Sequence, residues 1–203
     1  MRLKIVQTGE PVLRAPARPL SVDEINMPGM RELLTHMRDT MRDAPGVGLA
    51  APQVGLGIQL AVIEDRADYL AGIKPEILAE RERAPVQYFA LFNPRIVKYS
   101  EETTEFFEGC LSVAGFSGLV RRSRTVTVEY LNELGEPQTL EASGWFARIL
   151  QHEIDHLNGR LYIDRMETRT FSTMDNIARH WNGVPIPVVR EKLGITEDQT
   201  GEN

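Results

Sequence analysis

The alternation of apolar and polar residues predicts that the middle of the chain forms β-strands. Between residues 125 and 130, valine and tyrosine at even positions alternate with threonine and glutamate at odd positions, the pattern of a strand with one buried face. Apolar segments bounded by turn residues predict further strands. The expected strands are 58–64, 88–92, 95–99, 103–108, 124–131 and 138–142.

Helical spacing of apolar residues appears on both sides of this region. Residues 28–44 place methionine and leucine at intervals of three and four, begin with Pro28 and end before Pro45-Gly46, which predicts an amphipathic helix. A second helix is expected after Ser143, a plausible N-cap, and before Gly159, a residue typical of a helix C-terminus. A short helix is expected within 171–182, an exposed loop or short helix within 65–87, and a frayed polar tail at 196–203.

Strands that pair locally, followed by a helix, predict an α+β fold. With 203 residues the chain is expected to form a single domain, with antiparallel sheets packed around the helix that follows Ser143. The single cysteine, Cys110, cannot form an internal disulfide.

Composition narrows the function classes. The apolar fraction of 42% and the charged fraction of 26% are ordinary for a globular protein. The net charge of -6 argues against a nucleic-acid-binding surface, and we expect no membrane span, since no apolar segment approaches the required length. The N-terminal residues lack the apolar core of a signal peptide, so a cytoplasmic location is expected, or an organelle if a presequence has been removed.

Residues 152–156 carry the most informative chemistry, because they read H-E-x-x-H. On a helix, His152 and His156 lie on one face and can bind the same metal ion. Glu153 then lies beside that ion, where a carboxylate can take a proton from a metal-bound water. The motif therefore predicts metal-dependent hydrolysis, but it leaves the third ligand open.

Two familiar classes of metalloprotease place that third ligand downstream. One has a histidine where this chain has Tyr162, and the other has a glutamate near position 176, where this chain has Asp175 and Asn176. His36 lies on the helix 28–44, and His180 lies in the C-terminal segment without partner spacing. Cys110 is the upstream candidate, since a thiolate and two imidazoles make a tetrahedral site when water completes it. Carboxylates are the competing candidates, but none has a recognisable placement.

Three motifs in order resemble the peptide deformylase family. Residues 46–53 read GVGLAAPQ, residues 108–112 read EGCLS and residues 151–156 read QHEIDH, and each is similar to a motif of that family. The resemblance runs from about residue 3 to residue 170. It implies a catalytic domain at 1–170 and a C-terminal extension with a short helix and a polar tail at 171–203.

The resemblance also implies a role for each residue of these motifs. Cys110, His152 and His156 would hold one metal ion, Fe²⁺ in the cell, which Zn²⁺, Ni²⁺ or Co²⁺ can replace. Glu153 would act as general base and then general acid while the formyl group is removed from an N-formylmethionyl peptide and released as formate. The Gln53 side chain and the Leu111 backbone N–H would stabilise the oxyanion.

Substrate binding is expected along the first two motifs. An extended peptide can pair through main-chain hydrogen bonds with a glycine-rich segment, which reads little sequence and suits an enzyme acting on many nascent chains. The residues expected to bind substrate are Gly46, Val47, Gly48, Glu108 and Gly109.

Motif details point to a subgroup and leave two other functions open. Residues 111–118 and 142–145 are closest to the subgroup that includes mitochondrial and plastid deformylases. A nascent-chain substrate implies transient proximity to the ribosome, although the acidic end of the tail differs from the basic C-terminal helix of some bacterial relatives. The alternatives are a metallopeptidase that uses only H-E-x-x-H and cleaves unformylated peptides, and a non-catalytic module stabilised by a metal.

Overall fold

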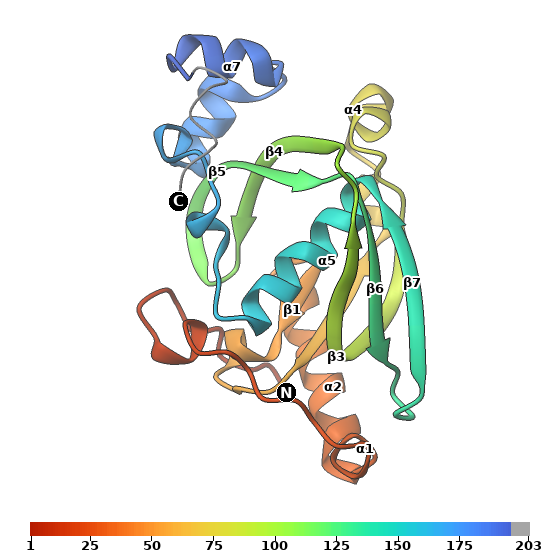
Figure 1. Cartoon of the computed structure of the whole chain (residues 1–203). Coiled ribbons are helices and arrows are strands. Elements are labelled where there is room, and N and C mark those ends of the chain that lie inside the picture. The colour runs from red at the N-terminus through yellow and green to blue at the C-terminus, as the bar shows by residue number, and fades with distance from the viewer. Residues whose placement is uncertain (196–203) are drawn as a thin grey trace.

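The computed structural model describes residues 1–195 as two antiparallel sheets with one long helix between them. Figure 1 shows this helix, α5 (Gly144–Leu157), running through the middle of the molecule, with the larger sheet on one side and strands β4 and β5 on the other. The arrangement confirms the predicted α+β class with sheets around a central helix. The tail predicted at 196–203 lies outside the described residues.

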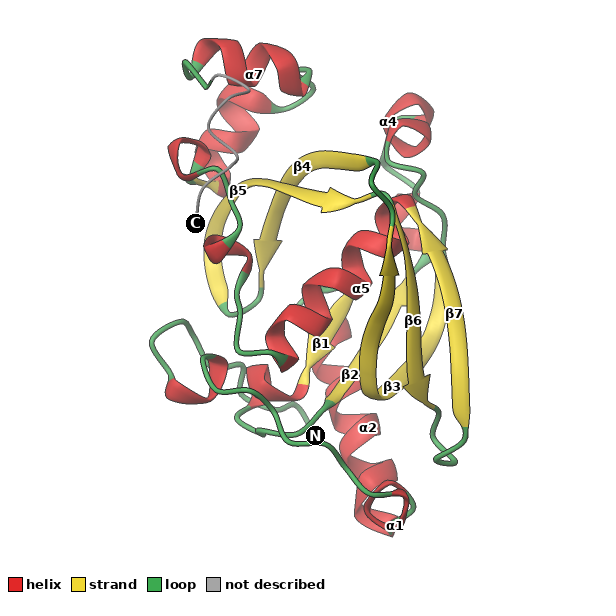
Figure 2. Cartoon of the chain, viewed as in Figure 1, coloured by secondary structure: helices red, strands yellow, loops and turns green. Residues whose placement is uncertain are grey.

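The larger sheet has five strands in the order β1-β2-β3-β6-β7, and the smaller has three in the order β4-β5-β8. Neighbouring strands within each sheet are antiparallel. Figure 2 shows both sheets in one colour, with the helices between and around them. The strands are β1 (Gly48–Ala50), β2 (Leu60–Asp65), β3 (Val86–Tyr99), β4 (Thr103–Cys110), β5 (Val113–Ser123), β6 (Thr125–Leu131), β7 (Pro137–Ser143) and β8 (Ser172–Thr173).

Besides α5, the helices lie at the two ends of the described chain and in the segment before β3. The α-helices are α1 (Val22–Ile25), α2 (Pro28–Asp43), α3 (Ala67–Leu70), α4 (Pro75–Glu80), α6 (Met174–Asn176) and α7 (Ile186–Lys192). A π-helix, η5 (Ile177–Trp181), follows α6, and 3-10 turns lie at η1 (Pro11–Leu13), η2 (Ala51–Val54), η3 (Tyr162–Asp164) and η4 (Thr168–Thr170). Among residues 1–195, no helix has the length and apolar character needed to cross a membrane.

The predicted helix 28–44 is confirmed within one residue as α2. Its apolar stripe is buried at Leu34, Met37 and Met41, which pack against β1 and β2 in one of the main core clusters. The helix predicted after Ser143 is α5. Ser143 occupies the N-cap position but its side chain makes no capping hydrogen bond; instead the Gly144 N–H donates to the Arg124 carbonyl.

Gly159 follows the end of α5 with a φ of 71°, as a C-terminal glycine should. A Cβ atom there would lie 2.6 Å from the carbonyl oxygen of Arg14, so the position also needs glycine for space. The helix end is thus fixed by both backbone conformation and close packing.

The two strands predicted at 88–92 and 95–99 are one strand, β3. Pro94 lies between the two predicted segments, and the strand continues past it through an irregularity in pairing with β6 between Phe92 and Arg95. Asn93 adopts a φ of 50° there, and its side chain bonds the backbone of Leu20 through both amide atoms, at 2.7 and 2.8 Å. These long-range bonds stabilise a backbone conformation that sequence periodicity does not reveal.

Strand β5 (Val113–Ser123) was not predicted, because glycines at 115 and 118 obscure its alternation. It pairs with β4 along almost its whole length and forms the centre of the smaller sheet. Gly118 is needed for packing, since a Cβ atom there would lie 2.8 Å from Sδ of Met166.

The C-terminal segment is attached to this smaller sheet. The short helix predicted within 171–182 corresponds to α6 and η5, but α7 was not predicted. Strand β8 pairs with β5, Val189 of α7 is fully buried, and Arg190 donates a 2.9 Å hydrogen bond to Glu105 on β4. The segment is therefore packed on the domain up to residue 195.

Candidate metal centre

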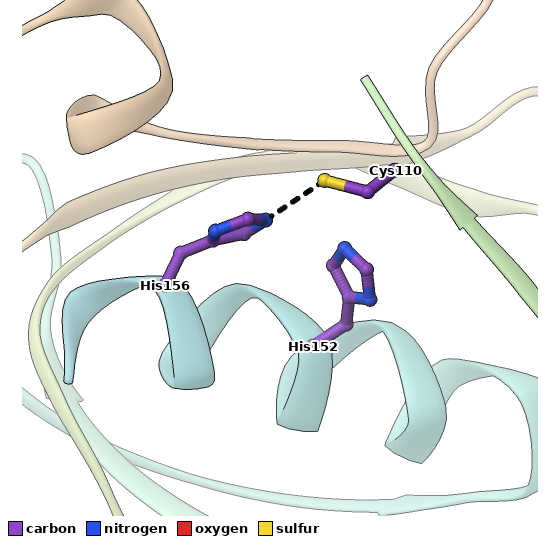
Figure 3. A group of neighbouring side chains, drawn as sticks. All are labelled: Cys110, His152 and His156. Atoms are coloured by element: carbon purple, nitrogen blue, oxygen red, sulfur yellow. Dashed lines mark hydrogen bonds between the residues drawn. The ribbon is translucent and has the colours of Figure 1, made fainter. Parts of the chain in front are cut away.

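Helix α5 and the end of β4 bring together the three residues predicted to bind a metal. His152 and His156 lie one helical turn apart on α5, and Cys110 is the last residue of β4. Figure 3 shows both imidazoles projecting from the helix toward the Cys110 sulfur. The ligand atoms of the three side chains all lie within 4.8 Å of one another.

The donor set and its spacing fit a tetrahedral metal ion. Sγ of Cys110 lies 3.3 Å from Nε2 of His156. Metal–sulfur and metal–nitrogen bonds of ordinary length at a tetrahedral angle would place these atoms about 3.6 Å apart. Three protein ligands also match a catalytic centre, which keeps one position open, rather than a closed structural site with four.

Glu108 fixes the orientation of the first imidazole. Nδ1 of His152 lies 3.0 Å from Oε2 of Glu108. Burial would raise the pKa of Glu108, but the charge and hydrogen bonds of Arg122 outweigh it, so the pKa is held well below its usual range. An ionised carboxylate only accepts, so Nδ1 donates and Nε2 is left to bind a metal.

Two arginines hold Glu108 in place. Arg122 donates to its two oxygens at 2.7 and 2.9 Å, and Arg148 donates to Oε1 at 2.6 Å. All three side chains are at most 5% exposed. A buried carboxylate surrounded in this way makes hydrogen bonds on both oxygens, and its removal would leave buried positive charge unpaired.

The same network continues along α5 to Asp155. Arg122 also donates to Asp155 at 2.7 Å, and Arg165 donates to both oxygens of Asp155 at 2.7 and 2.8 Å. Burial raises the pKa of Asp155, but the bonds from the two arginines lower it further, so the pKa falls below its usual range. The network ties β5 to the helix that carries both histidines.

Glu153 points into a tight, buried position beside these ligands. It is 4% exposed, and burial raises its pKa to about 7. Within the described residues, its Oε2 has no hydrogen-bond partner. A carboxylate with this pKa can accept a proton and return it near neutral pH, which is what a general base that becomes a general acid requires.

Gln53 presents its amide N–H groups to the same site. Its Oε1 accepts a 2.9 Å bond from the Ala50 backbone, which fixes which way the amide faces. Its Nε2 then lies 3.5 Å from Sγ of Cys110 and 3.3 Å from Oγ of Ser112. The side chain is 1% exposed, so this donor is held rigidly against the centre.

A cleft of about 630 Å³ opens beside the centre. Its size falls in the ordinary range for small-molecule sites. Ten of the eleven predicted site residues line it, and His156 alone does not. The predicted residues along the cleft are Gly46, Val47, Gly48, Gln53, Glu108, Gly109, Cys110, Leu111, His152 and Glu153.

The model of one known protein family matches most of this chain. The family model for polypeptide deformylase matches residues 2–172. The chain belongs to the polypeptide deformylase family. Membership confirms the predicted resemblance and makes the chain an enzyme, a hydrolase of protein biosynthesis that removes the N-formyl group from nascent peptides.

Individual deformylases from plants and bacteria are similar over most of the chain. A chloroplastic peptide deformylase 1A from Solanum lycopersicum is 40% identical over 94% of this chain and 67% of its own length. A chloroplastic/mitochondrial one from Arabidopsis thaliana is 42% identical, and the chain spans 65% of its length. Peptide deformylase 1 of Bifidobacterium longum is 40% identical over 95% of this chain and 86% of its own.

A solved deformylase structure has the same fold. The class I type b peptide deformylase of Acinetobacter baumannii, with Met-Ala-Ser bound, is 34% identical, with a TM-score of 0.73 over 82% of this chain and 99% of its own. The family's fold is therefore present in full, and the remaining part of this chain lies outside the match.

Several residues of the deformylase cleft were missed at the sequence level. Arg148 and Trp145 line it from α5, and Met174 lines it from α6. Arg148 could have been found, because it precedes His152 by four residues and so shares the face of both histidines. Met174 carried no such signal, and neither did Arg122, whose contact with Glu108 depends on β-pairing.

The structure separates the other histidines from this centre. His36 is half-buried on α2, 3.9 Å from Glu32, and the exposed His180 lies beside Trp181 on η5. Tyr162, which stands where one protease class has its third histidine, is buried with its ring stacked 6.4 Å from that of His152. It packs behind the ligand and contributes no metal-binding nitrogen.

Proposed function

We propose that this chain removes the formyl group from N-formylmethionyl peptides with Cys110, His152 and His156 as the ligands of one metal ion. The observation that carries the proposal is the meeting of these three donors with the buried carboxylate of Glu153 in one cleft. The family match gives no support to the metallopeptidase or to the non-catalytic module. The unpartnered oxygen of Glu153 also fits catalysis better than a closed structural site.

The metal proposed is Fe²⁺, one per chain, and Zn²⁺, Ni²⁺ or Co²⁺ can take its place, because a thiolate and two imidazoles accept all four. Such an ion, when bound, acidifies water and polarises the formyl oxygen. Glu108 contributes by holding His152 in the orientation that leaves Nε2 free. Such outer partners typically affect metal affinity tenfold or more.

Glu153 is the proposed general base and general acid. With a pKa raised by burial, its carboxylate accepts the proton of the attacking water and then donates it to the amine that leaves as the formyl C–N bond breaks. Gly48 allows this carboxylate to lie against β1, since its missing side chain leaves the space that Glu153 fills.

Gln53 and Leu111 are the proposed oxyanion donors. The Gln53 amide is preorganised by its bond to Ala50, so stabilising negative charge on the formyl oxygen costs little reorganisation. Leu111 follows Cys110 directly and lines the cleft, which supports its backbone N–H as the second oxyanion donor.

Substrate is proposed to bind along the cleft walls formed by Gly46, Val47 and Gly48 on one side and Glu108 and Gly109 on the other. All five line the cleft. The carboxylate of Glu108 is already bonded to Arg122, Arg148 and His152, so its side chain supports the site and its backbone is the part available to substrate.

The domain boundaries, the partners and the location of the protein complete the proposal. We propose residues 1–170 as the catalytic domain and 171–203 as an extension, with nascent N-formylmethionyl chains as partners and transient proximity to the ribosome where they emerge. The proposed location is the bacterial cytoplasm or an organelle, in line with bacterial and chloroplastic relatives. No nucleic-acid or membrane partner is proposed.

A formate-release assay tests the proposal. The protein is loaded with Fe²⁺ or Ni²⁺ without oxygen and given formyl-Met-Ala-Ser. We expect formate and Met-Ala-Ser in equal amounts, and no cleavage of unformylated peptides. Absence of turnover by fully loaded protein, or internal peptide cleavage, would overturn the proposal.

A further inference from the structure

Two exposed apolar side chains line the cleft, and a third is stacked on one of them. Phe116 of β5 and Met174 of α6 line it, and Phe171 stacks on Phe116 with ring centroids 4.9 Å apart and planes 11° from parallel. Their exposed fractions are 39%, 51% and 42%, whereas Glu153 and Gln53 at the inner end are almost fully buried. We call these three residues the apolar rim.

The rim is held in a fixed position by its backbone. Phe116 pairs with Thr173 and Ser117 with Ser172 where β8 joins β5. Thr173 then caps α6 by accepting a hydrogen bond from the Asn176 N–H, so Met174 begins a helix. The rest of the segment is packed on the sheet through Val189 and Arg190, as described above.

Single exposed apolar residues are common, but a cluster beside a cleft is typical of a ligand surface. Here the cleft already has a defined inner end at Cys110, His152 and Glu153, where the formyl group reacts. A peptide whose N-terminus is bound at this inner end must extend outward along the cleft. The residues after methionine are therefore the ones that can contact the rim. Phe116 and Met174 offer them apolar contact only.

The rim also includes a residue that lies beyond the end of the family model. The family model ends at residue 172, and Met174 lies beyond it. In the Acinetobacter baumannii relative, Met-Ala-Ser, a peptide with two small residues after methionine, is bound. A preference created by Met174 would therefore come from a residue outside the family model.

We propose that the apolar rim is a specificity site for apolar side chains that follow N-formylmethionine. The inference rests on the proposed deformylase function. Partial burial of one or two leucine side chains should raise kcat/KM for formyl-Met-Leu-Leu about threefold to tenfold above that for formyl-Met-Ser-Ser, mainly through KM.

The test compares this ratio in four proteins: wild type, Met174→Ser, Phe171→Ser and Leu134→Ser. Leu134 is the matched control, an apolar residue 58% exposed in the β6–β7 turn. Met174→Ser and Phe171→Ser should bring the ratio close to one, and Leu134→Ser should keep the wild-type ratio. An equal ratio in wild type and Met174→Ser would overturn the inference.

A second readout separates this inference from the deformylase proposal. Binding of the unformylated peptides Met-Leu-Leu and Met-Ser-Ser is measured by calorimetry with the metal-loaded proteins. Absence of formate release would overturn the proposed function. Tighter binding of Met-Leu-Leu than of Met-Ser-Ser, lost in Met174→Ser, would still support the rim as a specificity site. A dimer that Met174→Ser dissociates, with peptide preference unchanged, would assign the rim to self-association and overturn the inference.

Discussion

Glu153 occupies the space that a side chain at Gly48 would need. A Cβ atom at Gly48 would lie 2.2 Å from Oε1 of Glu153 and 2.6 Å from its carboxyl carbon. Gly46 is similarly close to the Leu111 side chain, at 2.9 Å. The glycines of the first motif therefore make room for the second and third motifs, in addition to lining the cleft.

Gly48→Ala should displace the Glu153 carboxylate without removing a metal ligand. Misplacement of a catalytic group by about 1 Å can lower the rate on the order of 100-fold, so we expect kcat to fall by about that factor while metal content stays at one per chain. Gly29→Ala is the control, because a Cβ atom there meets no atom within 4 Å. Full activity in Gly48→Ala would show that Glu153 can move without cost.

Glu153→Gln keeps the shape of the side chain but cannot accept the proton. We expect a folded protein with unchanged metal content and a loss of kcat of at least about 100-fold, in the range for a lost general base. Formate release and metal analysis on the same sample provide the measurement. Unchanged kcat would remove Glu153 from the proposed chemistry.

Cys110→Ala should weaken metal binding strongly, since it removes one of three ligands. Metal retained after dialysis against a mild chelator is the direct readout. Ser112→Ala is the variant for comparison, because the Ser112 hydroxyl accepts a hydrogen bond from the Gln53 amide and Ser112 is not one of the three proposed ligands. Full metal content in Cys110→Ala would show that Cys110 is a packing residue and not a metal ligand.

The contrast between the metal ligands and their supports shows what the sequence could predict. Spacing alone predicted that His152 and His156 share a helix face, because the period of a helix is local information. Cys110 could be proposed only by elimination and by family resemblance. The partners of Glu108 are 14, 40 and 44 residues away in the chain, so no local pattern joins them.

The same contrast between local pattern and long-range contact separates the elements of the fold that were predicted from those that were missed. Helix α2 was predicted within one residue because its apolar stripe repeats regularly, and β6 was predicted because one of its faces is buried. Strand β5 was missed since Gly118 packs against Met166 and gives no side chain to the alternation. Long-range packing thus decided the elements for which the local pattern was weak.

Glu108→Gln should weaken metal binding and also destabilise the fold. The neutral amide leaves the buried charge of Arg148 without its carboxylate and leaves Arg122 with Asp155 alone, and breaking a buried pair typically costs about 3–5 kcal/mol. Loss of the charged partner of His152 should also lower metal affinity about tenfold to 100-fold. Denaturant unfolding of the metal-free protein and a competitive metal titration measure the two effects separately.

Glu129→Gln is the control for that experiment. Glu129 pairs with Arg95 at the surface, where both side chains are exposed, so its loss should cost less than about 1 kcal/mol. Similar unfolding free energies for Glu108→Gln and Glu129→Gln would contradict the structural role assigned to the network.

The ion pair between Glu64 and Arg42 should give stability a measurable pH dependence away from the metal. Arg42 donates to both oxygens of Glu64 at 2.6 and 2.7 Å, and these bonds lower the pKa of Glu64. A group with a lowered pKa in the folded state contributes stability above its unfolded pKa, about 4.3 for glutamate, and loses it as the pH falls further. Glu64→Gln should therefore lower the free energy of unfolding by up to about 1 kcal/mol at pH 7, and the difference from wild type should be smaller at pH 3 than at pH 7. Urea unfolding of both proteins at the two pH values measures this difference in the free energy of unfolding. When Arg42 is also replaced by methionine, the destabilisation caused by Glu64→Gln at pH 7 should largely disappear. A difference that stays constant from pH 7 to pH 3 would mean that the substitution acts through packing rather than through charge.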